Sequence, residues 1–125
     1  MKIKFFVIFI VSVVLLVGGF GVFMNRNSFK PSKLDGFAQC LKYSGATFYG
    51  AFWCPHCQEQ KALFGSSKTY LPYVECSNPD QTQTQICKDK KIESYPTWVF
   101  KDGEVKTGKI ELSALAEKTQ CPLPQ

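Results

Sequence analysis

The chain has 125 residues, enough for one folded domain, and a net charge of +5. The first acidic residue is Asp35, and five basic residues precede it: Lys2, Lys4, Arg26, Lys30 and Lys33. From residue 34 onward 10 lysines balance 10 acidic residues, so the rest of the chain is neutral. The basic excess therefore lies near the N-terminus and does not indicate a nucleic-acid-binding face.

Residues 5–24 form an uncharged run rich in Val, Ile, Phe and Leu. A helix of this length spans about 30 Å, the thickness of the hydrocarbon core of a bilayer. The run is longer than the apolar region of a cleavable signal peptide, and no small-residue cleavage site ends it. This favours an uncleaved transmembrane signal anchor, with cleavage as the alternative.

The cysteines orient the anchor, because the basic residues on its two sides nearly balance. Six cysteines in so short a chain are typical of an oxidising compartment, which places the domain outside the cytoplasm, in a periplasm or at a cell surface. Besides the anchor we expect four parts: a cytoplasmic end at 1–4, a tether at 25–33, a folded domain at 34–121 and a tail at 122–125.

Helical and strand patterns alternate along the folded domain. In order, they predict a helix from residue 34 that Gly45 ends, a strand at 47–52, a helix at 55–64, a loop at 65–67, a strand at 70–76, a helix at about 80–90 that the turn cluster 77–80 caps, a strand at 98–100, a returning strand at 104–107 and a helix from 112 towards 121. The first two strands should form a right-handed parallel crossover, and the last two an antiparallel hairpin. The expected fold class is α/β, with helices on both faces of a mixed sheet.

Cys54 and Cys57 lie where the first strand turns into the second helix. Pro55 suits the first helical position because it has no N–H to leave unpaired. The helix N-terminus favours a thiolate, so Cys54 is the expected attacking sulfur and should be exposed. Cys57, one turn on, should be more buried and resolve the mixed disulfide. His56 would bring a partly positive imidazole near Cys54, or else serve as a solvated spacer.

Other uses of two close cysteines fit less well. A zinc site needs four ligands, usually as two close pairs, and the other cysteines are at 40, 76, 87 and 121, so no metal is predicted. Covalent haem attachment needs a histidine directly after the second cysteine, where Gln58 stands. A permanently closed structural disulfide remains an alternative.

With Trp53-Cys54-Pro55-His56-Cys57 after a strand and Tyr95-Pro96-Thr97 before a hairpin, the chain resembles the thioredoxin superfamily over about residues 34–121. The resemblance implies the thioredoxin fold, although the usual first strand is missing. It also implies a cis Pro96 that faces the active cysteines and leaves the backbone near Tyr95 free to pair with an extended client. The expected client-contacting residues are Trp53, Pro55, Tyr95 and Thr97. The alternatives are a plain turn proline at 96 and a packing role for Trp53.

One departure from the superfamily concerns the second thiol. Many thioredoxins carry a buried acid six residues before the first active cysteine, where this chain has Phe48. Glu59, Glu75 or solvent would then have to serve Cys57.

Within the superfamily, segments 49–58, 73–76, 85–88 and 95–98 resemble the thioredoxin-like domain associated with bacterial and plant homologues of vitamin K epoxide reductase. In those proteins a four-helix membrane quinone reductase reoxidises the domain. Since this chain has one apolar segment, the resemblance implies a separately encoded membrane partner, and no cofactor beyond the Cys54–Cys57 pair. It implies a membrane-anchored oxidant of secreted or surface proteins. A thiol reductase fed through the membrane and a non-catalytic binding module are the alternatives.

The remaining cysteines are candidates for structural disulfides. Cys76 and Cys87 end a strand and lie on the next helix, which predicts a disulfide, with a second redox relay as the alternative. Cys40 and Cys121 then pair by elimination. This pairing stays open, because the expected topology puts their helices on opposite faces of the sheet.

Overall fold

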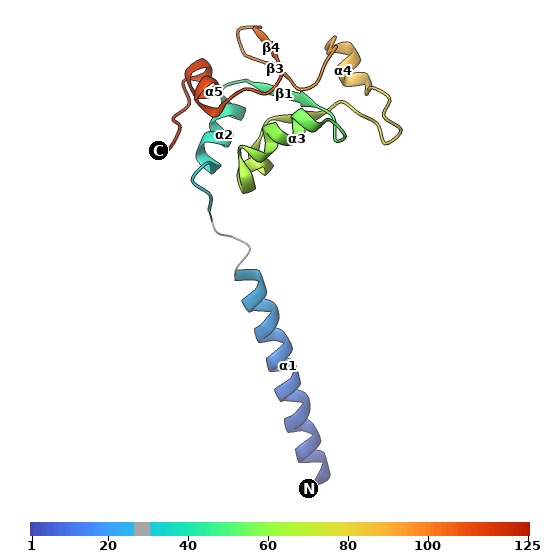
Figure 1. The fold of residues 1–125 in the computed structure, drawn as a ribbon. Coiled ribbons are helices and arrows are strands. Elements are labelled where there is room, and N and C mark those ends of the chain that lie inside the picture. Colours follow the sequence, from blue (N-terminus) through green and yellow to red (C-terminus); the bar gives the residue numbers. More distant parts are fainter. Residues whose placement is uncertain (27–30) are drawn as a thin grey trace. The chain divides into compact units, whose positions relative to one another are not determined.

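The structure is a computed structural model, which describes residues 1–26 and 31–125. The chain divides into two compact units, Met1–Pro31 and Ser32–Gln125 (Figure 1). Part of the predicted tether, residues 27–30, lies outside the described residues.

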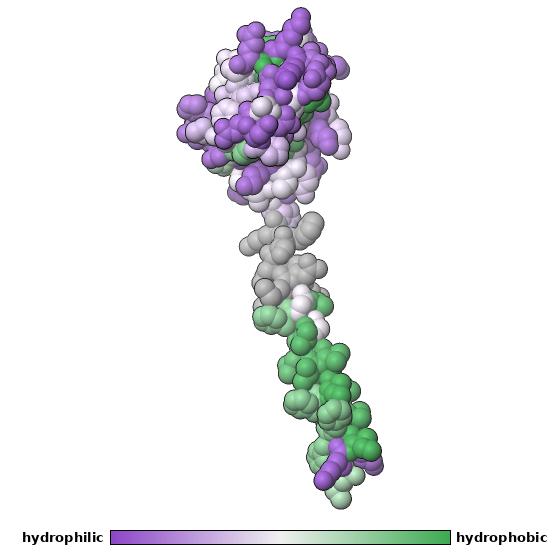
Figure 2. Space-filling view, turned by 90° about the vertical axis from the view of Figure 1, so that its right-hand side faces the viewer, coloured by the Kyte–Doolittle hydropathy of each residue, from purple (hydrophilic) through white to green (hydrophobic). Residues whose placement is uncertain are grey.

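In the described part of the N-terminal unit, residues 2–26 form one helix, α1 (Lys2–Arg26). Its 21-residue segment Lys2–Val22 contains an 18-residue window with a mean hydropathy of 2.8, and none of that window is buried. Figure 2 shows apolar side chains along most of this helix on the visible face. At 1.5 Å per residue the segment is about 31 Å long. In the described parts of the chain it is the one helix whose length and composition would let it cross a bilayer.

The C-terminal unit alternates helices and short strands, broadly as the sequence predicts. Its elements are α2 (Asp35–Tyr43), β1 (Thr47–Gly50), α3 (Pro55–Ala62), the 3-10 helix η1 (Gly65–Tyr70), β2 (Tyr73–Glu75), α4 (Gln85–Asp89), β3 (Thr97–Val99), β4 (Val105–Thr107) and α5 (Leu112–Thr119).

The four strands form one mixed sheet in the order β2-β1-β3-β4. β1 and β2 are parallel, with Phe48 opposite Tyr73, and helix α3 connects them. β3 pairs antiparallel with β1 on one side and with β4 on the other. The predicted parallel crossover and the C-terminal edge hairpin are therefore both present.

One face of the sheet carries the larger core. Phe48 of β1 and Trp98 of β3 stack there with ring centroids 4.9 Å apart. Phe37 of α2, Cys57 of α3 and Leu115 of α5 are buried in the same cluster. Since strand side chains alternate between faces, this cluster places α2, α3 and α5 on one side of the sheet.

The opposite face carries a smaller cluster. Tyr49 of β1 is buried there with Cys76, Cys87 of α4 and Ile92. Helix α4 thus packs against the second face, so helices lie on both faces as expected.

The position of α5 corrects one expectation. The order of the elements predicts that the helices of Cys40 and Cys121 lie on opposite faces, but α2 and α5 share a face because their apolar stripes enter the same core. Cys40 and Cys121 are joined by a disulfide, with their Cα atoms 5.8 Å apart.

Two segments have a different secondary structure from the one that the sequence predicts. The region expected to be a loop at 65–67 is the 3-10 helix η1. The third helix of the folded unit begins at Gln85, not near residue 80, because Asp80 binds the N–H and hydroxyl of Thr82 and does not cap a helix. Ser77 and Gln83 form an isolated antiparallel bridge that closes this turn.

Candidate active site

Cys54 and Cys57 occupy the junction between β1 and α3. Cys54 is the N-cap of α3, with extended backbone angles, and Pro55 follows at the first helical position. The backbone N–H of Cys57 donates to Cys54 Sγ at 3.2 Å. An unpaired N–H of the first helical turn therefore points at the sulfur, an arrangement that stabilises a thiolate. Both cysteines are free thiols in this structure.

The accessibility of Cys54 differs from the prediction. Cys54 was expected to be exposed, but its residue is 5% exposed, and Cys57 is 1% exposed. The thiol of Cys54 donates to the carbonyl oxygen of Tyr95 at 3.7 Å, so the Tyr95–Pro96 loop covers this side of the sulfur. The predicted order of burial, with Cys57 deeper, holds.

The Tyr95–Pro96 peptide bond is cis, as the resemblance to thioredoxins implied. Across the site, the ring of Trp53 meets that of Tyr95 edge to face, with centroids 6.0 Å apart. Trp53 remains 41% exposed, so it has both packing contacts and an open surface. The structure therefore brings Trp53, Cys54, Tyr95 and Pro96 together from two distant segments.

Two predicted site residues point elsewhere. The side chain of His56 is 70% exposed and its Nδ1 lies 3.2 Å from Glu59 Oε2, so the imidazole pairs with this carboxylate. Thr97 is buried, and its hydroxyl donates to the carbonyl oxygen of Ser94 at 2.7 Å. The Thr97 side chain is thus bonded within its own loop and offers no exposed surface to a client.

Tyr73, Glu75 and Lys61 form a polar cluster that borders Cys57, and the Cys54–Cys57 motif alone did not identify it. A Cβ on Gly50 would lie 2.9 Å from Tyr73 Cε2 and 3.1 Å from Cys57 Sγ, so glycine leaves the room in which these two side chains meet. Tyr73 donates its hydroxyl to Glu75 at 2.7 Å, and Lys61 Nζ lies 3.5 Å from the centroid of the Tyr73 ring.

Burial is the largest cause of the pKa shifts of Cys57, Tyr73 and Lys61. It raises the pKa of the Cys57 thiol to about 12, helped by the hydrogen bond with Cys54, and the charge of Lys61 acts in the opposite direction. Burial likewise raises the pKa of Tyr73, and it lowers the pKa of Lys61. Cys57 is therefore held as a neutral thiol at ordinary pH. Two spacings in the sequence are consistent with this cluster. Tyr73 and Glu75 are two positions apart on one strand and therefore share a face, and Lys61 follows Cys57 by one helical turn.

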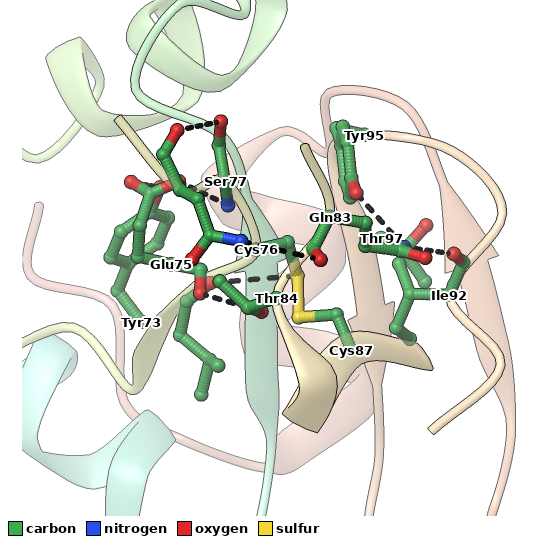
Figure 3. The surroundings of a disulfide bond; sticks show 12 residues. Tyr73, Glu75, Cys76, Ser77, Gln83, Thr84, Cys87, Ile92, Tyr95 and Thr97 are labelled. Atoms are coloured by element: carbon green, nitrogen blue, oxygen red, sulfur yellow. Dashed lines mark hydrogen bonds between the residues drawn. A yellow bond between two sulfur atoms is a disulfide. The ribbon is translucent and has the colours of Figure 1, made fainter. Parts of the chain in front are cut away.

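The second disulfide joins Cys76 and Cys87, whose Cα atoms are 5.5 Å apart (Figure 3). Both residues are fully buried. The pair closes the segment between β2 and α4, on the face of the sheet opposite the larger core.

Comparison with known proteins finds a named relative. The chain is 48% identical over 94 residues to the thiol-disulfide oxidoreductase LTO1 of Arabidopsis thaliana. The match covers 70% of this chain and 24% of that protein, so the chain spans about a quarter of the length of its relative. No family model matches the chain.

Proposed function

We propose that this chain is a membrane-anchored thiol–disulfide oxidoreductase of the thioredoxin superfamily. Its C-terminal unit works outside the cytoplasm and passes disulfides to secreted or surface proteins. A membrane quinone reductase that resembles vitamin K epoxide reductase restores the Cys54–Cys57 disulfide. The relative's name and its 48% identity support the reaction class, and the apolar helix α1 supports the anchor.

The observation that carries the proposal is the environment of Cys54 Sγ. It accepts the N–H of Cys57 at the start of α3 and lies against the carbonyl oxygen of Tyr95, next to the cis Pro96. An amide donor at a helix N-terminus stabilises the negative charge that this sulfur carries whenever it leaves a disulfide. Stabilising the reduced form makes the disulfide a stronger oxidant.

The proposed reaction is a pair of thiol–disulfide exchanges. A client thiolate attacks Cys54 Sγ in the oxidised protein, and Cys57 leaves as a thiolate that takes up a proton, as its raised pKa requires. A second client thiolate then attacks the client sulfur, and Cys54 leaves as a thiolate. The client gains a disulfide, and this protein gains the two electrons.

Reoxidation runs through the same sulfurs. Cys54 attacks a disulfide of the membrane partner, and Cys57, after losing its proton, attacks Cys54 and releases the partner's dithiol. The two electrons leave through the partner, whose quinone is the acceptor. The protein itself needs no resident cofactor for these steps.

Trapping tests the order of the cysteines. Cys57→Ser should accumulate mixed disulfides between Cys54 and both clients and a membrane protein, because the intermolecular bond loses its fast intramolecular exit. Cys54→Ser should trap far less, since Cys57 is almost fully buried. Equal absence of trapped species in both variants would favour a non-catalytic binding module.

Potential and topology complete the test. An oxidant should have a reduction potential near the roughly −120 to −180 mV of dedicated oxidases and isomerases, whereas about −270 mV would indicate a reductase with the same residues. A membrane-impermeant maleimide should label the reduced protein in intact cells. Labelling that requires lysis would contradict the orientation.

A further inference from the structure

The segment 76–87, which the Cys76–Cys87 disulfide closes, is the feature that the proposed reaction leaves unused. Both cysteines are fully buried, so a relay through their sulfurs has no direct access from the surface. Backbone bonds brace the segment further: the N–H of Thr84 donates to the carbonyl oxygen of Cys76, and that of Asn78 to Thr82, each at 2.8 Å. The disulfide and these bonds make the segment a compact, fixed loop.

Ser77, which follows Cys76 in this loop, binds the ring of Trp53. The indole Nε1 of Trp53 donates to Ser77 Oγ at 2.8 Å, and Ser77 donates its own hydroxyl hydrogen to the carbonyl oxygen of Asn78 at 2.9 Å. The hydroxyl of Ser77 is thereby oriented to accept from the indole. The backbone N–H of Ser77 is fixed in turn by Glu75 Oε1, which also accepts the N–H of Phe52.

Gln83, which forms a bridge with Ser77 across the turn, binds Tyr95, as Figure 3 shows. The side-chain amide of Gln83 donates one hydrogen to the carbonyl oxygen of Ile92 at 2.6 Å and the other to the Tyr95 hydroxyl at 2.9 Å. Both donors of Gln83 are therefore used to join the loop to the segment that leads into the cis Pro96.

The two held rings meet beside the sulfur of Cys54. Trp53 precedes Cys54 in sequence and contacts Tyr95 edge to face, and the Tyr95 carbonyl oxygen accepts the Cys54 thiol. We infer that the disulfide-closed loop 76–87 positions both aromatic walls of the client site, with Ser77 and Gln83 as specificity-determining positioning residues. The inference rests on the proposed function. The rings of Trp53 and Tyr95 are the surface by which the protein selects extended polypeptide thiols over small ones.

The chemistry of the two reductants explains the selectivity. A polypeptide must lay its backbone and side chains against the walls before its thiolate reaches Cys54, so misplaced rings weaken that approach. A small dithiol needs only access to the sulfur. Ser77→Ala and Gln83→Met remove the bonds to the rings without touching Cys54.

The experiment uses the oxidised full chain in detergent and two reductants, dithiothreitol and reduced, unfolded ribonuclease A. In each variant the second-order rate constant for the polypeptide should fall about fivefold to tenfold, the loss expected for one positioning hydrogen bond. The rate constant for dithiothreitol should stay within about twofold of the parent. Gln85→Met is the matched control and should change neither rate, because the exposed Gln85 side chain donates to Asp89 on its own helix and, among the described residues, to no ring of the site.

Failure of this inference and failure of the proposed function give different results. Unchanged polypeptide rates in Ser77→Ala and Gln83→Met would overturn the inference, and so would equal falls with both reductants, which indicate damage to the thiol site itself. A parent protein that reacts with neither reductant would refute the proposed function instead. Acrylamide quenching of Trp53 in a Trp98→Phe background gives an independent measure: Ser77→Ala should increase quenching, and unchanged quenching would contradict the hold on the ring.

Discussion

Tyr73 donates its hydroxyl to Glu75 Oε2 at 2.7 Å, and this pair lies on the Cys57 side of the sheet. The other acid that the sequence offered for the second thiol, Glu59, is exposed and pairs with His56. Glu75 also accepts the N–H of Phe52 through its other oxygen, which fixes the carboxylate in place. Of the two acids, Glu75 is therefore the one bound to a side chain that borders Cys57, and we expect it to be the proton acceptor for this thiol.

Glu75→Gln should slow the step in which Cys57 attacks a mixed disulfide at Cys54. A Cys54 adduct with a coloured aromatic thiol, followed by stopped-flow absorbance, measures this step directly. At neutral pH the release should slow by about tenfold or more, because a positioned base is lost, and it should recover as rising pH removes the Cys57 proton without help. Glu59→Gln should follow the parent's pH profile. The reverse pattern, with Glu59→Gln slow and Glu75→Gln normal, would assign the role to Glu59.

Gly50→Ala should destabilise the folded unit by about 1–3 kcal/mol, the usual cost of overpacking. The new methyl group would stand 2.9 Å from the Tyr73 ring and 3.1 Å from Cys57 Sγ, both closer than ordinary contact. Urea unfolding measures the change. Gly36→Ala in α2 is the control: nothing lies within 4 Å of its new methyl group, and alanine favours the helix, so stability should be equal or higher.

The stability of the reduced protein should fall at alkaline pH. Burial and the Cys54 hydrogen bond raise the pKa of Cys57 from 9.0 to about 12, so the folded state holds a proton that the unfolded chain loses near pH 9. The resulting stabilisation is complete below about pH 9 and is lost as pH rises towards 12. Urea midpoints from pH 8 upward should decline more steeply for the parent than for Cys57→Ser. Parallel declines would contradict the raised pKa.

Replacing Cys76 and Cys87 together by serine should lower stability and leave the thiol chemistry at Cys54 in place. A loop of this length contributes up to about 3 kcal/mol in the chain-entropy model, so the unfolding midpoint should drop accordingly. Oxidation of dithiothreitol by the pre-oxidised variant, assayed below its unfolding temperature, should remain near the parent rate. A folded double variant that no longer oxidises dithiothreitol would favour the relay interpretation.

Local patterns in the sequence were enough to predict most of the elements and the position of the Cys54–Cys57 pair at the start of a helix. The Cys54-Pro55-His56-Cys57 spacing after an aromatic strand placed one thiol at a helix N-terminus, because strand alternation and helix capping act between near neighbours. The parallel crossover and the hairpin followed from the order of elements. The apolar run at residues 5–24 likewise needed only its own length and composition.

Contacts between distant segments could be decided only in the tertiary structure. α2 and α5 share a face of the sheet, which allows Cys40 to reach Cys121 across 81 positions, and no local pattern specifies that packing. The cover over Cys54, the polar group of Tyr73 and Glu75 behind Cys57, and the hold of Ser77 and Gln83 on the two rings all join separate elements. Their residues are ordinary in the sequence, and they come together only because the sheet brings distant segments side by side.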